Sequence, residues 1–222
     1  MFVDVMSKAV VATLGFEEKF AVRALVRRGL EPGDKVVLVT GPVIDKVAKA
    51  INYLREFLRY FEGVGVEVFE VSEIHNFTEA ISKIKDLFRM LLEKYDYVIV
   101  NLSGGMRALI IEVLTAIVLL PKELKDRMVI ELDTEDGKAT IEIPRELSIL
   151  INPPDLGVKE DIIKALISLG GEADIYTLAQ RLNKDETTIR RQLESLKELR
   201  LIELTYRPLK AKLKDIARLL VA

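Results

Sequence analysis

The sequence predicts an α/β fold with a mainly parallel sheet, followed by a C-terminal winged helix-turn-helix domain. Short runs rich in Val and Ile alternate with helical segments over residues 8–120, as expected of a sheet whose crossovers cover both faces. Two consecutive prolines, Pro153 and Pro154, then interrupt every regular pattern. Beyond them the chain changes to short helical segments followed by a strand, which is the element order of a winged helix-turn-helix.

The first part of the chain contains four strand–helix units and a closing hairpin. Apolar, largely β-branched runs predict strands at 8–14, 35–40, 66–71 and 97–100. Apolar residues at helical spacing, or a nearly continuous apolar run in the last case, predict helices at 17–28, 43–61, 78–94 and 108–120. Two further strands, 127–133 and 139–143, flank Asp136-Gly137, a pair that suits a type I′ turn. This hairpin adds an antiparallel edge to the parallel sheet.

The proline-containing segment 151–157 is the predicted linker between two domains. It separates a first domain at 1–150 from a second at 158–222. The elements expected in the second domain are helices at 159–169, 175–182 and 185–199, a strand at 201–206 and a final helix at 211–221. Asp185 is the expected N-cap of the third helix of this domain.

The composition argues against several classes of protein. Half of the 222 residues are hydrophobic and the formal net charge is −2, which predicts neither a disordered chain nor a globally basic nucleic-acid coat. Residues 158–222 hold 13 Lys and Arg against 10 Asp and Glu, whereas the rest of the chain holds 20 against 25. The positive charge is therefore segregated to the C-terminal part.

The chain has no cysteine and a single histidine, His75. Thiolate chemistry is thereby excluded, and a His-based metal site or a Ser-His triad is not expected. We expect no metal ion and no cofactor, and we place His75 in a surface loop or at a helix start. The sequence also shows no apolar run of membrane-spanning length and no signal-peptide pattern, so we expect a cytoplasmic protein with no membrane partner.

A loop of small residues, Ser103-Gly104-Gly105-Met106-Arg107, joins the fourth strand to the following helix. Two glycines let the backbone approach a ligand closely, and the amides that open a helix attract an anion. Arg107 adds a fork of donors that matches phosphate oxygens, while Asn101 and Ser103 can bond hydroxyls or bases. The alternative interpretation is that the two glycines serve only a tight turn.

Three loops are expected to meet at one edge of the sheet. Ligands of parallel sheets bind beyond the carboxyl ends of the strands, and the loops 13–16, 40–42 and 101–107 all fall there. They predict a single pocket, in which Phe16 either stacks on a base or anchors the core. A dinucleotide-binding enzyme fits less well, because the first loop lacks G-x-G-x-x-G and no acidic residue closes the second strand.

The third helix of the second domain carries a candidate nucleic-acid surface. Ile189, Leu193 and Leu196 form its buried stripe, which leaves polar residues for the opposite face. The residues expected on that outward face are Thr187, Thr188, Arg190, Arg191 and Gln192. Arg and Gln read base edges in the major groove, and Thr and Lys contact phosphates. The basic residues expected near the wing are Arg207, Lys210 and Lys212. The alternative is a solvated basic face in a module that binds protein.

Three features carry a resemblance to a known family: the loop Thr13-Leu14-Gly15-Phe16, the loop that ends in Arg107, and the C-terminal domain. Together they resemble the CRISPR-associated Rossmann-fold (CARF) regulators of archaeal type I-A systems. The resemblance extends over essentially the whole chain. The resemblance implies a homodimer whose Rossmann-like domains enclose a cyclic oligoadenylate, with cyclic tetra-adenylate as the expected ring. It also implies winged helices that bind double-stranded promoter or repeat DNA, and it leaves contact with a CRISPR interference complex open. The ligand-binding residues carried over from the family are Thr13, Leu14, Gly15, Phe16, Asn101, Ser103, Gly104, Gly105, Met106 and Arg107.

Three functions follow from these observations. The leading prediction is a ligand-controlled transcription regulator that is not an enzyme. The second is a ring nuclease, in which Ser103 orients a ribose for in-line attack and Arg107 or a nearby Lys stabilises charge, although neither loop holds a general-base His. The third is a DNA-binding protein whose N-terminal domain only dimerises.

Overall fold

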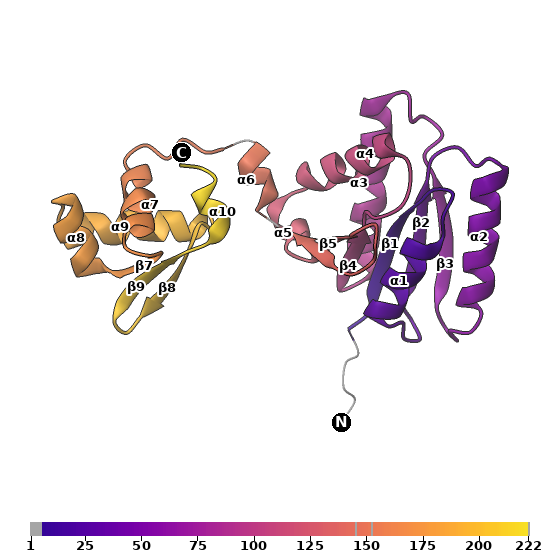
Figure 1. Cartoon of the computed structure of the whole chain (residues 1–222), viewed down its shortest axis with the longest axis horizontal. Helices are drawn as coiled ribbons and strands as arrows, with labels where there is room; N and C mark the ends of the chain where they lie inside the picture. Colours follow the sequence, from indigo (N-terminus) through magenta and orange to yellow (C-terminus); the bar gives the residue numbers. More distant parts are fainter. Residues whose placement is uncertain (1–5, 145, 152, 222) are drawn as a thin grey trace. The chain divides into compact units, whose positions relative to one another are not determined.

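A computed structural model describes residues 6–144, 146–151 and 153–221 of the chain. The chain divides into two compact units, residues 1–145 and 146–222 (Figure 1). The sequence placed residues 146–150 in the first domain, ahead of the predicted linker. In the structure Ile149 and Leu150 pack against the apolar core of the second unit, so the division falls a few residues earlier than expected.

A six-stranded sheet forms the centre of the first unit, with strand order β3-β2-β1-β4-β5-β6. The strands are β1 (Lys8–Leu14), β2 (Lys35–Thr40), β3 (Gly65–Glu70), β4 (Tyr97–Asn101), β5 (Met128–Asp133) and β6 (Thr140–Ile143). Neighbours among β1 to β5 are parallel, and β6 pairs antiparallel with β5. The structure thus confirms the predicted sheet with its antiparallel edge.

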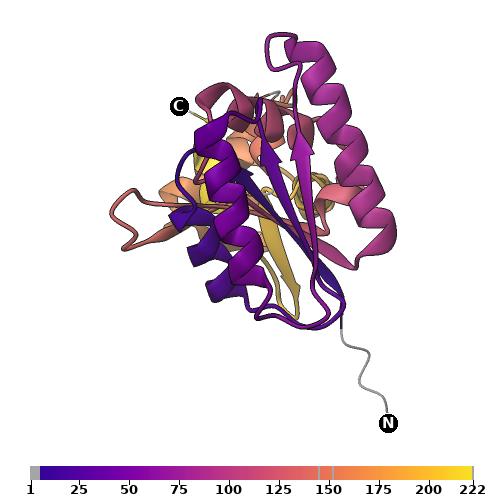
Figure 2. The same ribbon diagram turned by 90° about the vertical axis from the view of Figure 1, so that its right-hand side faces the viewer.

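Helices cover both faces of this sheet. The helices of the first unit are α1 (Lys19–Arg28), α2 (Asp45–Leu58), α3 (Phe77–Lys94), α4 (Arg107–Val118) and the short α5 (Lys122–Lys125). In β1, Val10 and Ala12 belong to the apolar layer under α1 and α2, whereas Ala9 and Val11 belong to the layer under α3 and α4. Figure 2 shows α2 and α3 on opposite sides of the strands. Because both faces are buried, the central strands carry continuous apolar runs rather than an alternating pattern.

The order of the strands creates a switch point between β1 and β4. These two strands are adjacent and parallel, with Ala12 opposite Asn101. The helix that follows β1 lies over one face of the sheet and the helix that follows β4 lies over the other. The two chain segments therefore diverge at the carboxyl edge, which is where open α/β sheets bind ligands.

The second unit combines helices with a small antiparallel sheet of order β7-β9-β8. Its helices are α6 (Leu147–Ile151), α7 (Lys159–Ser168), α8 (Ile175–Leu182), α9 (Glu186–Glu198) and α10 (Asp215–Arg218). Its strands are β7 (Glu172–Asp174), β8 (Ile202–Tyr206) and β9 (Leu209–Leu213). The order α7-β7-α8-α9-β8-β9 is that of a winged helix-turn-helix. Asp185 caps α9 as predicted, because its carboxylate accepts the Thr188 N–H at 2.8 Å.

Two local predictions were wrong. The expected helix at 211–221 is replaced by β9 and a single short helix, α10, since Leu209, Ala211 and Leu213 are buried while Lys210 and Lys212 are exposed. This alternation has the period of a strand. The turn between β5 and β6 is not type I′, which needs positive φ at both central residues. Gly137 has φ +68°, but among the described residues Asp136 is not one with positive φ.

None of the helices in the described ranges is long and apolar enough to cross a membrane. His75 lies exposed in the loop between β3 and α3, as the sequence predicted.

Candidate functional site

The loops that follow β1 and β4 are in close contact at the carboxyl edge of the sheet. The Thr13 hydroxyl donates to the carbonyl oxygen of Gly104 at 2.5 Å. A Cβ on Gly104 would lie 2.6 Å from the carbonyl oxygen of Thr13, and a Cβ on Gly15 would lie 3.0 Å from Cα of Gly105. The first distance is shorter than a Cβ tolerates against backbone, and the second is tighter than most Cβ contacts. Glycine at these positions therefore lets the two loops touch.

The start of α4 presents unpaired donors next to these glycines. Gly105 has φ +96°, a conformation that glycine adopts without strain, and Met106 follows as an N-cap residue whose side chain makes no capping hydrogen bond. Arg107 begins α4, its side chain is exposed, and it forms no ion pair with any residue that the structure describes. An exposed guanidinium beside free helix-start amides is an arrangement that favours an anion.

Phe16 is exposed at the same edge. Its ring is 57% exposed, so the alternative interpretation of Phe16 as a core anchor is wrong. The loop after β2 joins the other two, because a Cβ on Gly41 would lie 3.0 Å from Sδ of Met106. From the start of α2, Lys46 places Nζ 5.5 Å from the centroid of the Phe16 ring. The three loops thus meet, as predicted from the sequence.

Several of the predicted ligand residues instead have buried side chains. Leu14, Thr13 and Asn101 are each at most 1% exposed. Asn101 donates from Nδ2 to Oε1 of Glu131 at 3.2 Å, while its Oδ1 accepts the N–H of Ser103 at 3.1 Å. The Ser103 hydroxyl accepts the backbone N–H of Asp133 at 2.7 Å and keeps its own proton to donate. These side chains hold the glycine loop in place, which leaves Phe16, Met106 and Arg107 as the exposed side chains of the set.

A buried ion-pair network behind the glycine loop was not predicted. Glu131 on β5 is fully buried and accepts hydrogen bonds from Arg27 and Arg28, the last two residues of α1. Burial raises the pKa of Glu131, but the hydrogen bonds from Arg27, Arg28 and Asn101 outweigh it and leave the pKa below its ordinary value of 4.5. Arg27 also pairs with Asp133 at 2.9 Å. The network could have been predicted from the sequence by the two acidic residues, Glu131 and Asp133, in the otherwise apolar strand β5.

The outward face of α9 contains four of the five predicted residues. Thr187, Arg190 and Arg191 are exposed, and Thr188 is half-buried. The Thr188 hydroxyl donates to the Asp185 carboxylate at 2.7 Å, so its proton is already used. Arg190 and Arg191 form no ion pair with any described residue, which leaves two free guanidinium groups on this face.

The prediction that Gln192 lies on the outward face of α9 is wrong. Its side chain is 9% exposed, and its Oε1 is buried without a hydrogen-bond partner among the described residues. The physical reason lies in helix spacing, since residues 189, 192, 193 and 196 fall on one face of a helix. Gln192 therefore lies with the buried stripe of Ile189, Leu193 and Leu196 rather than on the outward face.

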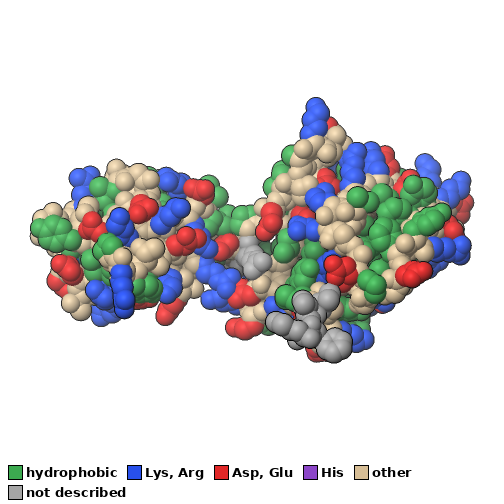
Figure 3. All heavy atoms as spheres, turned by 90° about the horizontal axis from the view of Figure 1, so that it is seen from below, with side chains coloured by type: hydrophobic (Ala, Val, Ile, Leu, Met, Phe, Trp, Pro, Cys, Tyr) green, Lys and Arg blue, Asp and Glu red, His purple; other side chains and the backbone are tan. Residues whose placement is uncertain are grey.

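The hairpin of β8 and β9 adds further basic residues. Arg207, at the turn, and Lys210, on β9, are both exposed, and Lys210 lies 3.8 Å from a Glu172 carboxylate oxygen. Lys197 on α9 donates to the Tyr206 hydroxyl at 2.5 Å, which links α9 to the hairpin. On the face shown in Figure 3, Lys and Arg side chains of the second unit stand among Asp and Glu side chains. No excess of basic side chains is seen over the second unit on this face.

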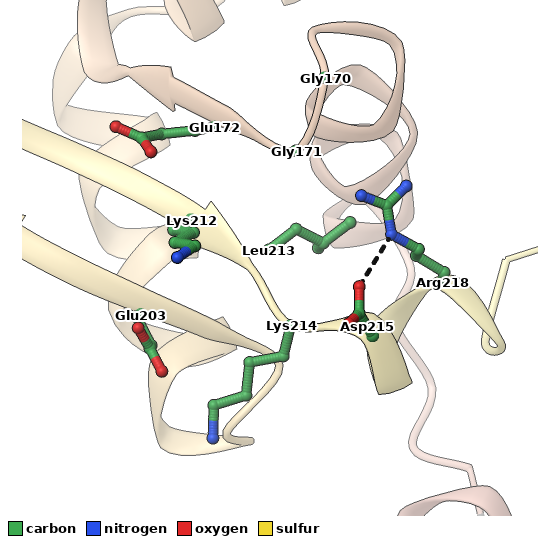
Figure 4. A pocket seen from close by; sticks show the side chains of 9 residues that line it. All are labelled: Gly170, Gly171, Glu172, Glu203, Lys212, Leu213, Lys214, Asp215 and Arg218. Atoms are coloured by element: carbon green, nitrogen blue, oxygen red, sulfur yellow. Dashed lines mark ion pairs between the residues drawn. The ribbon is translucent and has the colours of Figure 1, made fainter.

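A hollow of about 390 Å³ lies elsewhere in the second unit (Figure 4). Gly170, Gly171 and residues of β9 and α10 contribute to its lining. Acidic and basic side chains line it together, and Arg218 pairs with Asp215 at 3.4 Å within it. Since its charges offset one another, the hollow has no preference for an anionic or a cationic ligand. The described residues also hold no cluster of three or more His, Cys, Asp or Glu that would bind a metal ion.

The fold and these two surfaces define a class: proteins with a Rossmann-like sheet domain followed by a helix-turn-helix domain. Residues 8–144 match the model of the Csa3 CRISPR-associated Rossmann-like domain. The chain therefore belongs to the Csa3 family, which confirms the resemblance noted in the sequence.

Two relatives carry the name "CRISPR locus-related putative DNA-binding protein Csa3". The protein from Thermoproteus tenax is 28% identical over 198 residues, which cover 86% of this chain and 83% of the relative. The protein from Saccharolobus solfataricus is 27% identical over 193 residues, which cover 86% of this chain and 78% of the relative. This chain is similar to both along most of its length.

Solved structures with a similar fold are more distant. Can2 from Sulfobacillus thermosulfidooxidans, in complex with cyclic tetra-adenylate, is 12% identical with a TM-score of 0.46, and the match covers 60% of this chain and 34% of that one. Csm6 from Enterococcus italicus, bound to cyclic hexa-2′-fluoro-hexa-dAMP, is 16% identical with a TM-score of 0.47, and the match covers 87% of this chain and 55% of that one. This chain thus spans about a third and about half of those two proteins.

Proposed function

We propose that this protein is a CRISPR-associated transcription regulator that binds a cyclic oligoadenylate in its first unit and double-stranded DNA through its second. The observation that carries the proposal is the exposed Arg107 guanidinium, free of ion pairs among the described residues, on a glycine loop that touches the loop of the exposed Phe16. An anion with aromatic bases satisfies both groups. The names of the two Csa3 relatives support the DNA-binding role.

The ligand is proposed to be a ring of adenylates, with cyclic tetra-adenylate as the first choice. Each phosphodiester carries one negative charge that Arg107 and the α4 amides can bind, and each base offers a face to Phe16. Gly15, Gly104 and Gly105 let the two loops pack against each other, and the side chains of Thr13, Leu14, Asn101 and Ser103 hold these loops in place. A ring with twofold symmetry fits two copies of the site, so the proposed binding unit is a homodimer.

The DNA-binding surface is proposed to be the exposed face of α9 with the β8–β9 hairpin. Arg190 and Arg191 supply free guanidinium groups for base edges or phosphates, and Thr187 adds an exposed hydroxyl. Arg207 and Lys210 are placed to contact the sugar-phosphate backbone as a wing does. This assignment omits Gln192, because its side chain is buried.

Calorimetric titration with cyclic tri-, tetra- and hexa-adenylate tests the ligand. We expect one ring per two chains, and we expect Arg107→Ala to weaken binding about tenfold or more, as loss of a charge-assisted contact does. Arg55→Ala is the matched control, because it removes the same exposed charge from the far half of α2. Failure of all three rings to bind the wild-type protein would overturn the proposal.

Chromatography of the ligand after prolonged incubation separates sensing from cleavage. We expect the ring to be recovered intact. Linear products from the wild-type protein that disappear with Ser103→Ala would establish the ring-nuclease alternative instead.

A further inference from the structure

Lys46 was not among the predicted ligand residues, yet the fold brings it to the same edge of the sheet. It lies in the first turn of α2, and its Nζ is 5.5 Å from the centroid of the Phe16 ring. The ring is 57% exposed and the Lys46 side chain is also exposed. An ammonium within about 6 Å of a ring centroid is attracted to the ring face. Lys46 and Phe16, from two different loops, therefore form one surface feature.

The loop that carries Lys46 is fixed against the glycine loop. Gly41 is buried, and a Cβ at this position would lie 3.0 Å from Sδ of Met106, the residue before Arg107. The β2–α2 loop is also tied to β3, since the Val43 N–H donates to Glu70 Oε1 at 3.1 Å. The path of this loop is thus set by contacts with Met106 on one side and with β3 on the other.

The charge of Lys46 is uncompensated in the described part of the chain. Lys46 makes no ion pair there, and neither does Arg107. The nearby acidic groups are otherwise engaged or exposed: Glu17 pairs with Lys19, and Glu70 accepts the Val43 N–H. Two cations without ion pairs among the described residues, one of them beside an exposed aromatic side chain, make a surface with affinity for a nucleotide that carries both a base and a phosphate.

We propose that Lys46 is a ligand-binding residue of this site: its ammonium binds a phosphodiester oxygen of the nucleotide whose base stacks on the free face of Phe16. This inference rests on the proposed function, whose ligand it shares. In this proposal Arg107 and Lys46 bind different phosphates of the cyclic ligand. This pairing of cations with an aromatic side chain indicates a nucleotide ligand. A phosphate compound without bases would bind the cations but would make no use of the exposed Phe16 side chain.

Titration of cyclic tetra-adenylate into the Lys46→Ala protein tests the inference, with Lys49→Ala as the matched control. Lys49 is exposed on the same helix one turn further on, so its loss removes an equal charge. We expect Lys46→Ala to raise Kd about tenfold and Lys49→Ala to change it less than about twofold. We also expect Lys46→Arg to retain most of the affinity. Equal effects of Lys46→Ala and Lys49→Ala would overturn the inference.

Two further measurements separate a phosphate contact from other roles. Raising the salt concentration should shrink the difference between wild type and Lys46→Ala, because screening weakens a charge pair at the surface. In a Phe16→Leu background, Lys46→Ala should still weaken binding; no further loss there would mean that Lys46 only orients the ring. If wild type and Lys46→Ala bind the cyclic ligand equally well, this inference alone is refuted. If the wild-type protein binds no cyclic oligoadenylate, the proposed function is refuted.

Discussion

Asn101 and Glu131 are joined across β4 and β5 by a hydrogen bond of 3.2 Å from Nδ2 to Oε1. The other end of the Asn101 amide accepts the N–H of Ser103, the first residue of the glycine loop's Ser-Gly-Gly segment. Glu131 in turn accepts from Arg27 and Arg28 at the end of α1. A buried carboxylate therefore connects a helix terminus to the loop on which the proposed ligand site depends.

Glu131→Gln should destabilise the protein by about 2–4 kcal/mol, because it breaks a buried ion-pair network while leaving two arginines in place. The pKa of Glu131 lies below its ordinary 4.5 in the folded state, so the network stabilises the fold above that pH. This contribution is lost as the pH falls through the lowered pKa. Thermal unfolding should thus show a gap between wild type and Glu131→Gln at pH 7 that closes in acid.

Glu142→Gln is the control for this experiment. Glu142 lies opposite Glu131 on β6 and is exposed, so its substitution should leave the unfolding temperature nearly unchanged. A gap between wild type and Glu131→Gln that persists unchanged at pH 3 would contradict the electrostatic account.

Gly104→Ala should loosen the contact between the β1 and β4 loops. The new Cβ would lie 2.6 Å from the carbonyl oxygen of Thr13, which is backbone and cannot rotate away. We expect a loss of about 1–3 kcal/mol in the free energy of unfolding, as for other overpacked sites, together with weaker ligand binding. Gly65→Ala is the control, since the nearest atom to its Cβ would be Cδ of the flexible Lys35 side chain at 3.2 Å, and backbone would be met only at 3.9 Å. Urea denaturation measures both, and equal stability of the two variants would disprove the close contact.

Arg190→Ala should weaken binding to duplex DNA. Its guanidinium is exposed on α9 without an ion pair among the described residues, so a contact with a phosphate or a base edge is lost outright. We expect affinity for a duplex enriched from a random library by the wild-type protein to fall about tenfold. Arg218→Ala removes the same charge from α10, where the side chain pairs with Asp215, and should have little effect. Fluorescence anisotropy makes the comparison, and indistinguishable curves for the two variants would remove α9 from the DNA interface.

Gln192→Met should stabilise the protein without changing DNA binding. The substitution removes a buried Oε1 that has no partner among the described residues and keeps a side chain of similar length. We expect a gain of about 1 kcal/mol in the free energy of unfolding. The same DNA titration checks the second half of the prediction: a strong loss of affinity would show that Gln192 turns outward to contact a base.

The sequence by itself determined the alternation of strands and helices. Both faces of β1, β2 and β4 are buried, so their central residues are apolar, and the strands at 8–14 and 35–40 were predicted to the residue. Where burial is partial the sequence was weaker. In β9, Leu209, Ala211 and Leu213 alternate with lysines over only five residues, too short a run to be distinguished from a helix by spacing.

The sequence also predicted which loops share an edge, because the carboxyl ends of parallel strands must lie together. Only the tertiary structure decided which side chains of those loops remain available. Asn101 is buried where β5 places Glu131 opposite it, and Phe16 is exposed although Leu14, two residues earlier, belongs to an apolar layer. Lys46 and Phe16 are thirty positions apart, and no local pattern relates them. Their proximity exists only because β1 and β2 pair in parallel and deliver both loops to the same edge.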